Sequence, residues 1–131
     1  MPASVRGRCD AIEECYEFML AYAAQGLSGD ASQPNAVQVR GLLTRAEAAL
    51  DGLAVAFREA VADAALTPAA PYDAFLDVLD RDAGASLAAV RLVLAQPAIS
   101  SQLVDNLNAS IHLRALLTDL FLIDEILHPR A

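Results

Sequence analysis

Helical periodicity runs through almost the whole chain and is the feature that most constrains its fold. Apolar residues recur every three or four positions along four long stretches, and no β-hairpin signal interrupts them. This spacing places the apolar side chains on one side of an α-helix. In the first stretch the stripe consists of Val5, Cys9, Ile12, Tyr16, Met19, Ala23 and Leu27. The sequence therefore predicts an all-α protein.

Glycine and proline mark the boundaries between these stretches. Gly26 and Gly29 end the first, Pro68 and Pro71 precede the third, and Pro97 precedes the fourth. We expect helices over approximately residues 4–27, 36–66, 71–96 and 100–128. Gly52 lies inside the second range, where packing is expected to offset its cost of about 1 kcal/mol. Short connections then favour a single domain, an up-down-up-down four-helix bundle.

Length, composition and charge exclude several classes of protein. A chain of 131 residues fits one domain, and a hydrophobic content of 56% excludes intrinsic disorder. The formal net charge is −8, and the arginines form no cluster. Nucleic acids and anionic membrane surfaces both attract basic patches, so we expect neither as a partner. The acidity instead suits a basic protein partner.

Two cysteines and the N-terminal sequence predict a cytoplasmic setting. Cys9 and Cys15 are six residues apart, about 9 Å along a helix, which exceeds the reach of a disulfide. We expect reduced thiols, with Cys9 packed in the core stripe and Cys15 more exposed. The first residues do not resemble a signal peptide, and charges interrupt the longest apolar region, residues 113–127.

The fourth predicted helix has two apolar arcs where a bundle needs only one. The first arc contains Leu113, Leu116, Leu117, Leu120, Ile123 and Leu127, and the second contains Val104, Ile111, Ala115, Leu122 and Ile126. The excess predicts a homodimer or partner surface, since large exposed apolar areas are rare on monomers. The alternative is a central helix buried on both sides. The interface residues we expect are Leu113, Leu116, Leu117, Leu120, Leu122 and Ile126.

No catalytic pattern accompanies these helices. The chain has no glycine-rich phosphate loop, and the acidic residues around Cys15 disfavour a reactive thiolate. We therefore predict a non-enzymatic protein-binding bundle without a cofactor, such as an adaptor, an assembly factor or a chaperone-like subunit. Its partner is a second copy, or a basic or apolar protein.

A small-molecule or metal-binding bundle is the alternative function. Glu125 and His128 form a Glu-x-x-His motif, a spacing that helical bundles use to hold iron, although it occurs only once here. The candidate metal residues are Glu14, Glu17, Glu125 and His128. An apolar ligand would instead contact Tyr16, Met19, Phe57 and Phe75, residue types that at helical spacing more often form the core.

Overall fold

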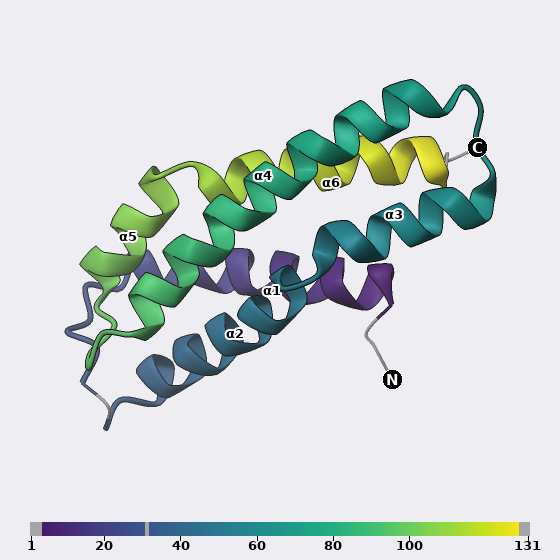
Figure 1. Ribbon diagram of the computed structural model, residues 1–131. Helices are drawn as coiled ribbons and strands as arrows, with labels where there is room; N and C mark the ends of the chain where they lie inside the picture. The colour runs from purple at the N-terminus through teal and green to yellow at the C-terminus, as the bar shows by residue number, and fades with distance from the viewer. Residues whose placement is uncertain (1–3, 31, 129–131) are drawn as a thin grey trace.

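A computed structural model describes residues 4–30 and 32–128 of the chain, and all regular structure in these ranges is α-helical. Figure 1 shows the path of the helices. The described residues form six helices: α1 (Val5–Ala23), α2 (Pro34–Leu50), α3 (Leu53–Ala64), α4 (Ala69–Leu94), α5 (Ser101–Ala109) and α6 (His112–Leu127). The all-α prediction is confirmed. No helix within the described ranges is long and apolar enough to cross a membrane.

Two of the four predicted helices are each broken in two. The range 36–66 divides at Gly52, whose φ of 80° is left-handed. We expected one continuous helix through this glycine, and that expectation is wrong. The range 100–128 divides at Ile111, whose φ is 64°. The Ser110 hydroxyl closes the last turn of α5 by donating to the Leu107 carbonyl at 2.5 Å. The break changes which residues of the fourth range share a face.

Arginine side chains from other helices cap two helix C-termini. Nη1 of Arg8 on α1 donates to the carbonyls of Ala49 and Asp51 at 3.0 and 2.7 Å, where α2 ends. Arg40 on α2 donates to the carbonyls of Leu94 and Gln96 at 2.9 and 2.7 Å, where α4 ends. The last carbonyls of a helix have no partner within it, so these contacts satisfy them and fix one helix against another.

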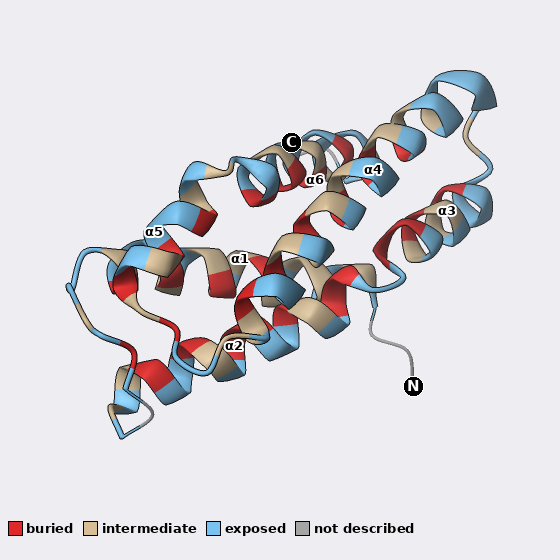
Figure 2. Cartoon of the chain, turned by 60° about the vertical axis from the view of Figure 1, so that its left-hand side comes forward, coloured by how far each residue is buried: buried red, intermediate tan, exposed pale blue. Residues whose placement is uncertain are grey.

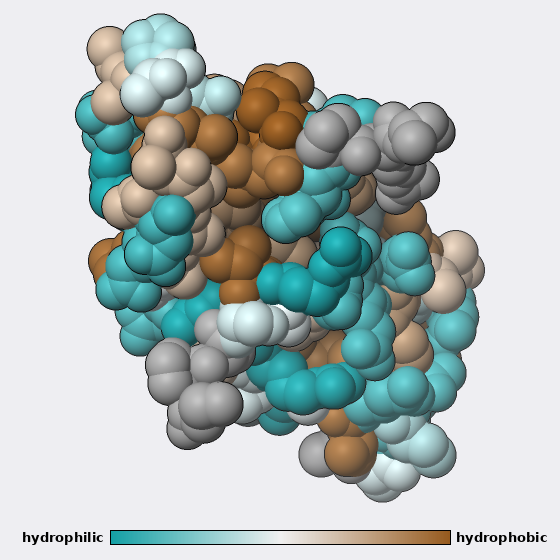
Figure 3. Space-filling model, turned by 90° about the vertical axis from the view of Figure 1, so that its right-hand side faces the viewer, coloured by the Kyte–Doolittle hydropathy of each residue, from teal (hydrophilic) through white to brown (hydrophobic). Residues whose placement is uncertain are grey.

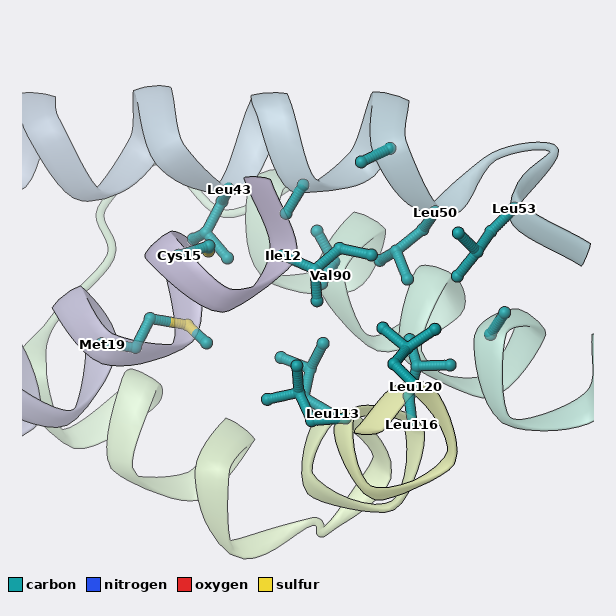
Figure 4. Packing of buried hydrophobic residues seen from close by; sticks show 14 of the residues in the cluster. Ile12, Cys15, Met19, Leu43, Leu50, Leu53, Val90, Leu113, Leu116 and Leu120 are labelled. Carbon is teal, nitrogen blue, oxygen red and sulfur yellow. The ribbon is translucent and has the colours of Figure 1, made fainter. Parts of the chain in front are cut away.

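The buried hydrophobic side chains form one cluster to which all six helices contribute. Helix α1 packs against α2 and α5, and α4 packs against α2, α3 and α6. Figure 2 shows the buried residues on the sides of the helices that face one another, with exposed residues outside. Figure 4 shows Ile12 and Met19 of α1 facing side chains from α2 and α6. Helix α1 begins and α6 ends at the same end of the molecule (Figure 1).

The expected roles of the two cysteines are reversed. Cys15 is fully buried, whereas Cys9 is only half-buried, and both thiols are free. The buried face of α1 consists of Ile12, Cys15, Met19 and Tyr22, so it is rotated from the stripe that the sequence suggested. Burial raises the pKa of the Cys15 thiol to about 12. Cys15 is therefore a small apolar core residue.

Candidate functional site

The six predicted interface residues divide into two groups in the structure. Leu113, Leu116, Leu117 and Leu120 belong to the core, where they pack against other helices of the same chain. Leu122 and Ile126 are exposed, with 53% and 50% of their surface accessible. Only these last two are available on the chain's surface. They belong to the second apolar arc, of which Val104 is buried on α5.

Leu122 and Ile126 border a groove between the start of α4 and the C-terminal half of α6. The groove has a volume of about 330 Å³, and we call it the α4–α6 groove. Figure 3 shows the end of the molecule where α3 meets α4 and α6 finishes, with an apolar area bordered by hydrophilic residues. Seven residues line the groove: Pro68, Pro71, Tyr72, Phe75, Leu122, Ile123 and Ile126.

The local sequence accounts for each wall of this groove. Pro68 is the N-cap of α4 and Pro71 lies in its first turn, where the missing N–H would have no helical partner anyway. Tyr72 directly follows Pro71 and Phe75 lies about one turn further, and both are half-buried at the edge of the core. On α6, Leu122 and Ile126 are four residues apart and therefore share a face. The result is an aromatic and proline wall opposite an aliphatic one.

A second hollow, of about 380 Å³, lies between the start of α1 and the end of α6. Cys9, Glu13, Phe121, Asp124 and His128 are among its lining residues. Nδ1 of His128 is 3.3 Å from a carboxylate oxygen of Asp124. Burial, followed by the charges of Glu13 and Asp124, raises the pKa of Cys9 to about 12. A raised pKa keeps the Cys9 thiol protonated at neutral pH, and the thiolate is the nucleophilic form of cysteine.

The four candidate metal residues do not form a common site. Glu14 is paired with Arg45 of α2 at 3.3 Å, and Glu17 and Glu125 are exposed on the surface. His128 lies beside Asp124 in the second hollow. Within residues 4–30 and 32–128 no three His, Cys, Asp or Glu side chains are arranged to hold a metal ion. Of the candidate apolar-ligand residues, Met19 and Phe57 are core residues and only Phe75 lines the α4–α6 groove.

A pair of carboxyl groups that the sequence analysis did not identify lies between α4 and α6. Asp119 of α6 is half-buried, and its Oδ2 atom is buried without a hydrogen-bond partner among the described residues. Burial, followed by the hydrogen bond and charge of Asp82, raises the pKa of Asp119 to about 7. On α6, Asp119 is one turn from the buried residues Leu116 and Ile123, so its half-buried position follows from helical spacing. Its relation to Asp82 depends on how α4 and α6 pack against each other, which the sequence pattern of one helix does not show.

No protein-family model matches this chain, and neither the curated proteins nor the solved structures include a significant match.

Proposed function

We propose that this chain is a non-enzymatic, cytoplasmic protein-binding bundle that forms a homodimer through the α4–α6 groove. The observation that carries this proposal is the groove itself, where Leu122 and Ile126 expose half of their surface beside Tyr72 and Phe75. Covering the exposed half of a leucine or isoleucine contributes about 1 kcal/mol. Two copies would cover four such side chains, in addition to the aromatic ones.

The charge of the groove supports a second copy as its occupant. The chain carries a net charge of −8, so two copies repel each other over most of their surface. None of the seven residues that line the groove is charged at neutral pH. Two copies that meet there bring no charged lining side chains together. The groove therefore offers a region of contact where the repulsion is low.

The shape of this surface supports a two-fold arrangement. Tyr72 and Phe75 of α4 and Leu122 and Ile126 of α6 line the same groove, and the last two side chains are half-exposed at its edge. A two-fold interface brings the same patch of both copies together, so it needs a hollow and a protrusion on one surface. In the dimer, the aliphatic side chains of α6 from each copy enter the hollow of the other.

Another uncharged hollow, at the far end of α4, provides a matched control surface. Leu92 is 67% exposed there, beside Val93, Pro97 and Leu103. This surface also contains Gln96, whose carbonyl accepts from Arg40 and whose side chain donates to the Leu92 carbonyl at 2.9 Å. It has no aromatic residue among its lining. We therefore propose the α4–α6 groove, and not this hollow, as the contact surface.

Sedimentation equilibrium of three proteins tests the proposal. The double variant Leu122→Gln/Ile126→Gln is expected to weaken dimerisation at least about 100-fold, since four half-exposed side chains are lost from the interface. The control Leu92→Gln is expected to dimerise as the unmodified chain does. Dimerisation that survives the double variant, or that is lost in the control, would overturn the proposed interface. An unmodified chain that binds only other proteins through these two residues would overturn the homodimer.

A further inference from the structure

A hollow of about 400 Å³ lies between the end of α1, the second half of α5 and the first turn of α6, and we call it the α1–α5–α6 hollow. It shares no residue with the α4–α6 groove or with the hollow that contains Cys9. Its lining combines both signs of charge with an amide group and an apolar side. The seven lining residues are Leu20, Ala23, Ala24, Asp105, Asn108, Ala109 and Arg114.

The two charged side chains of this hollow have no partner within the described chain. Asp105 of α5 and Arg114 of α6 are both exposed, and neither forms an ion pair with the other or with another described residue. Arginines elsewhere cap helices or pair with carboxylates, as Arg40 and Arg91 do. The charges of Asp105 and Arg114 are therefore available to a ligand that carries both signs of charge.

Asn108 adds a hydrogen-bond acceptor that lacks a donor. It lies three residues after Asp105 on α5, so the two side chains share a face. Oδ1 of Asn108 is buried and accepts no hydrogen bond from the described residues. No hydrogen bond within the described chain holds this amide group, so it can turn toward a donor in the hollow. Because an unpaired buried acceptor is costly, the site favours a ligand that brings a donor.

The ends of two helices add partial charges of matching sign. Helix α1 ends at Ala23, and the C-terminal end of a helix carries partial negative charge. Helix α6 begins at His112, two residues before Arg114, and no side chain caps its first turn. The N–H groups at that end carry partial positive charge. The partial charge of α6 adds to that of Arg114, and an anion is favoured there.

One side of the hollow is apolar. Ala23 and Ala24 follow Leu20 by three and four residues, so the three side chains lie on one face of α1. Leu20 exposes 51% of its surface beside the two short alanine side chains. Covering this apolar surface is favourable, and an aliphatic group of a ligand would cover it without losing a hydrogen bond.

We propose that the α1–α5–α6 hollow binds a free amino acid with an aliphatic side chain. The carboxylate of the ligand accepts hydrogen bonds from the Arg114 guanidinium. Its ammonium group donates to the Asp105 carboxylate and to Oδ1 of Asn108. The charged groups of an amino acid are attached to one carbon atom, so it can bridge two side chains that do not pair directly. Since exposed charges contribute little each, we expect a millimolar dissociation constant.

An NMR titration with L-leucine tests this proposal. The backbone amide signals of Leu20, Ala24, Asp105, Asn108 and Arg114 should shift together and saturate at millimolar ligand. Isocaproate lacks the ammonium group and isoamylamine lacks the carboxylate, so each should bind at least about 10-fold more weakly than L-leucine. The absence of a saturable shift with L-leucine would overturn the site. Equal binding of L-leucine and either analogue would overturn the assigned ligand class.

Matched variants assign each charged group of the ligand to its residue. Arg114→Gln should weaken L-leucine binding at least about 10-fold and leave isoamylamine binding unchanged. Asp105→Asn should weaken L-leucine binding equally and leave isocaproate binding unchanged. The control Arg81→Gln removes an exposed arginine of α4 that is remote from the hollow lining and should bind L-leucine as the unmodified chain does. L-leucine binding that survives both Arg114→Gln and Asp105→Asn would overturn the proposal.

The inference does not depend on the proposed homodimer. The Leu122→Gln/Ile126→Gln variant keeps every residue of the α1–α5–α6 hollow, so its affinity for L-leucine should equal that of the unmodified chain. A monomeric chain that binds L-leucine would overturn the proposed function alone. A dimer that does not bind L-leucine would overturn this inference alone.

Discussion

Leu120 and Leu122 are two residues apart on α6, yet Leu120 is 1% exposed and Leu122 is 53% exposed. Two residues correspond to about 200° around a helix, so the two side chains point to opposite sides. Leu120 contributes to the core, and Leu122 borders the α4–α6 groove. The proposed interface therefore lies on the opposite side of α6 from the residues that hold the fold together.

Matched substitutions at these two leucines should have different effects. Leu120→Ala is expected to reduce the free energy of unfolding by about 2–5 kcal/mol, because it leaves a cavity in the core. Leu122→Ala is expected to change the stability of the monomer by less than about 1 kcal/mol, since its side chain is half in solvent. Urea unfolding at low protein concentration measures both. Equal losses for the two variants would show that Leu122 is also part of the core.

A buried hydrogen bond connects α1 to the segment before α5. The Tyr22 hydroxyl donates to the Ile99 carbonyl at 2.6 Å, and both residues are fully buried. Tyr22→Phe leaves this carbonyl without its donor and is expected to cost about 1–3 kcal/mol of unfolding free energy. The matched change Tyr16→Phe, at a half-buried tyrosine for which the described chain shows no hydroxyl hydrogen bond, should cost much less. Similar losses for both variants would argue against this contact.

Gly29 lies against the same segment and cannot carry a side chain. Its φ is 83°, and a Cβ atom there would lie 2.4 Å from the backbone carbon and oxygen of Ile99. Gly29→Ala is expected to destabilise the chain by more than about 1 kcal/mol, because positive φ and steric overlap both oppose it. Gly41→Ala, in the middle of α2 with open space around it, is expected to stabilise by about 0.5–1 kcal/mol. Thermal unfolding shows whether the two changes have opposite signs.

Ile111 is held in a backbone conformation that its side chain disfavours. Its φ of 64° is left-handed, a region that a β-branched residue rarely adopts, and its side chain is exposed. Ile111→Asn keeps the break between α5 and α6 and removes this penalty, so we expect a gain of about 1 kcal/mol. Chemical unfolding measures the gain. A loss of stability in this variant would show that the Ile111 side chain makes stabilising contacts that asparagine does not replace.

The helical fold was predictable from the sequence, whereas the helix breaks were not. The three-to-four spacing of apolar residues is a local property, and it identified the helical stretches and the apolar arcs. It did not separate core from surface, because it assigned Leu113, Leu116, Leu117 and Leu120 to an interface although they lie in the core. At Gly52 the backbone changes direction where a side chain from another helix contacts the end of α2. That side chain belongs to Arg8, which holds the end of α2. Local patterns contain no information on these contacts.

The candidate site was predictable only in part, for a related reason. Leu122 and Ile126 stand out as a second apolar stripe on α6, but their partners Tyr72 and Phe75 come from α4. Their proximity depends on how far one helix is shifted along the other. The buried face of α1 shows the same limit. Two apolar stripes overlap in its sequence, and the stripe that contains Cys15 is the one that packs against the other helices.

Native mass spectrometry of the unmodified chain, purified without chelators, tests the central claim most directly. We expect a species at twice 13.8 kDa with no additional bound mass, its proportion increasing with protein concentration. The Leu122→Gln/Ile126→Gln variant should give the single-chain mass under the same conditions. A single-chain mass for the unmodified protein at every concentration would contradict the homodimer. A stoichiometric additional mass on each chain would instead indicate a bound ligand or metal.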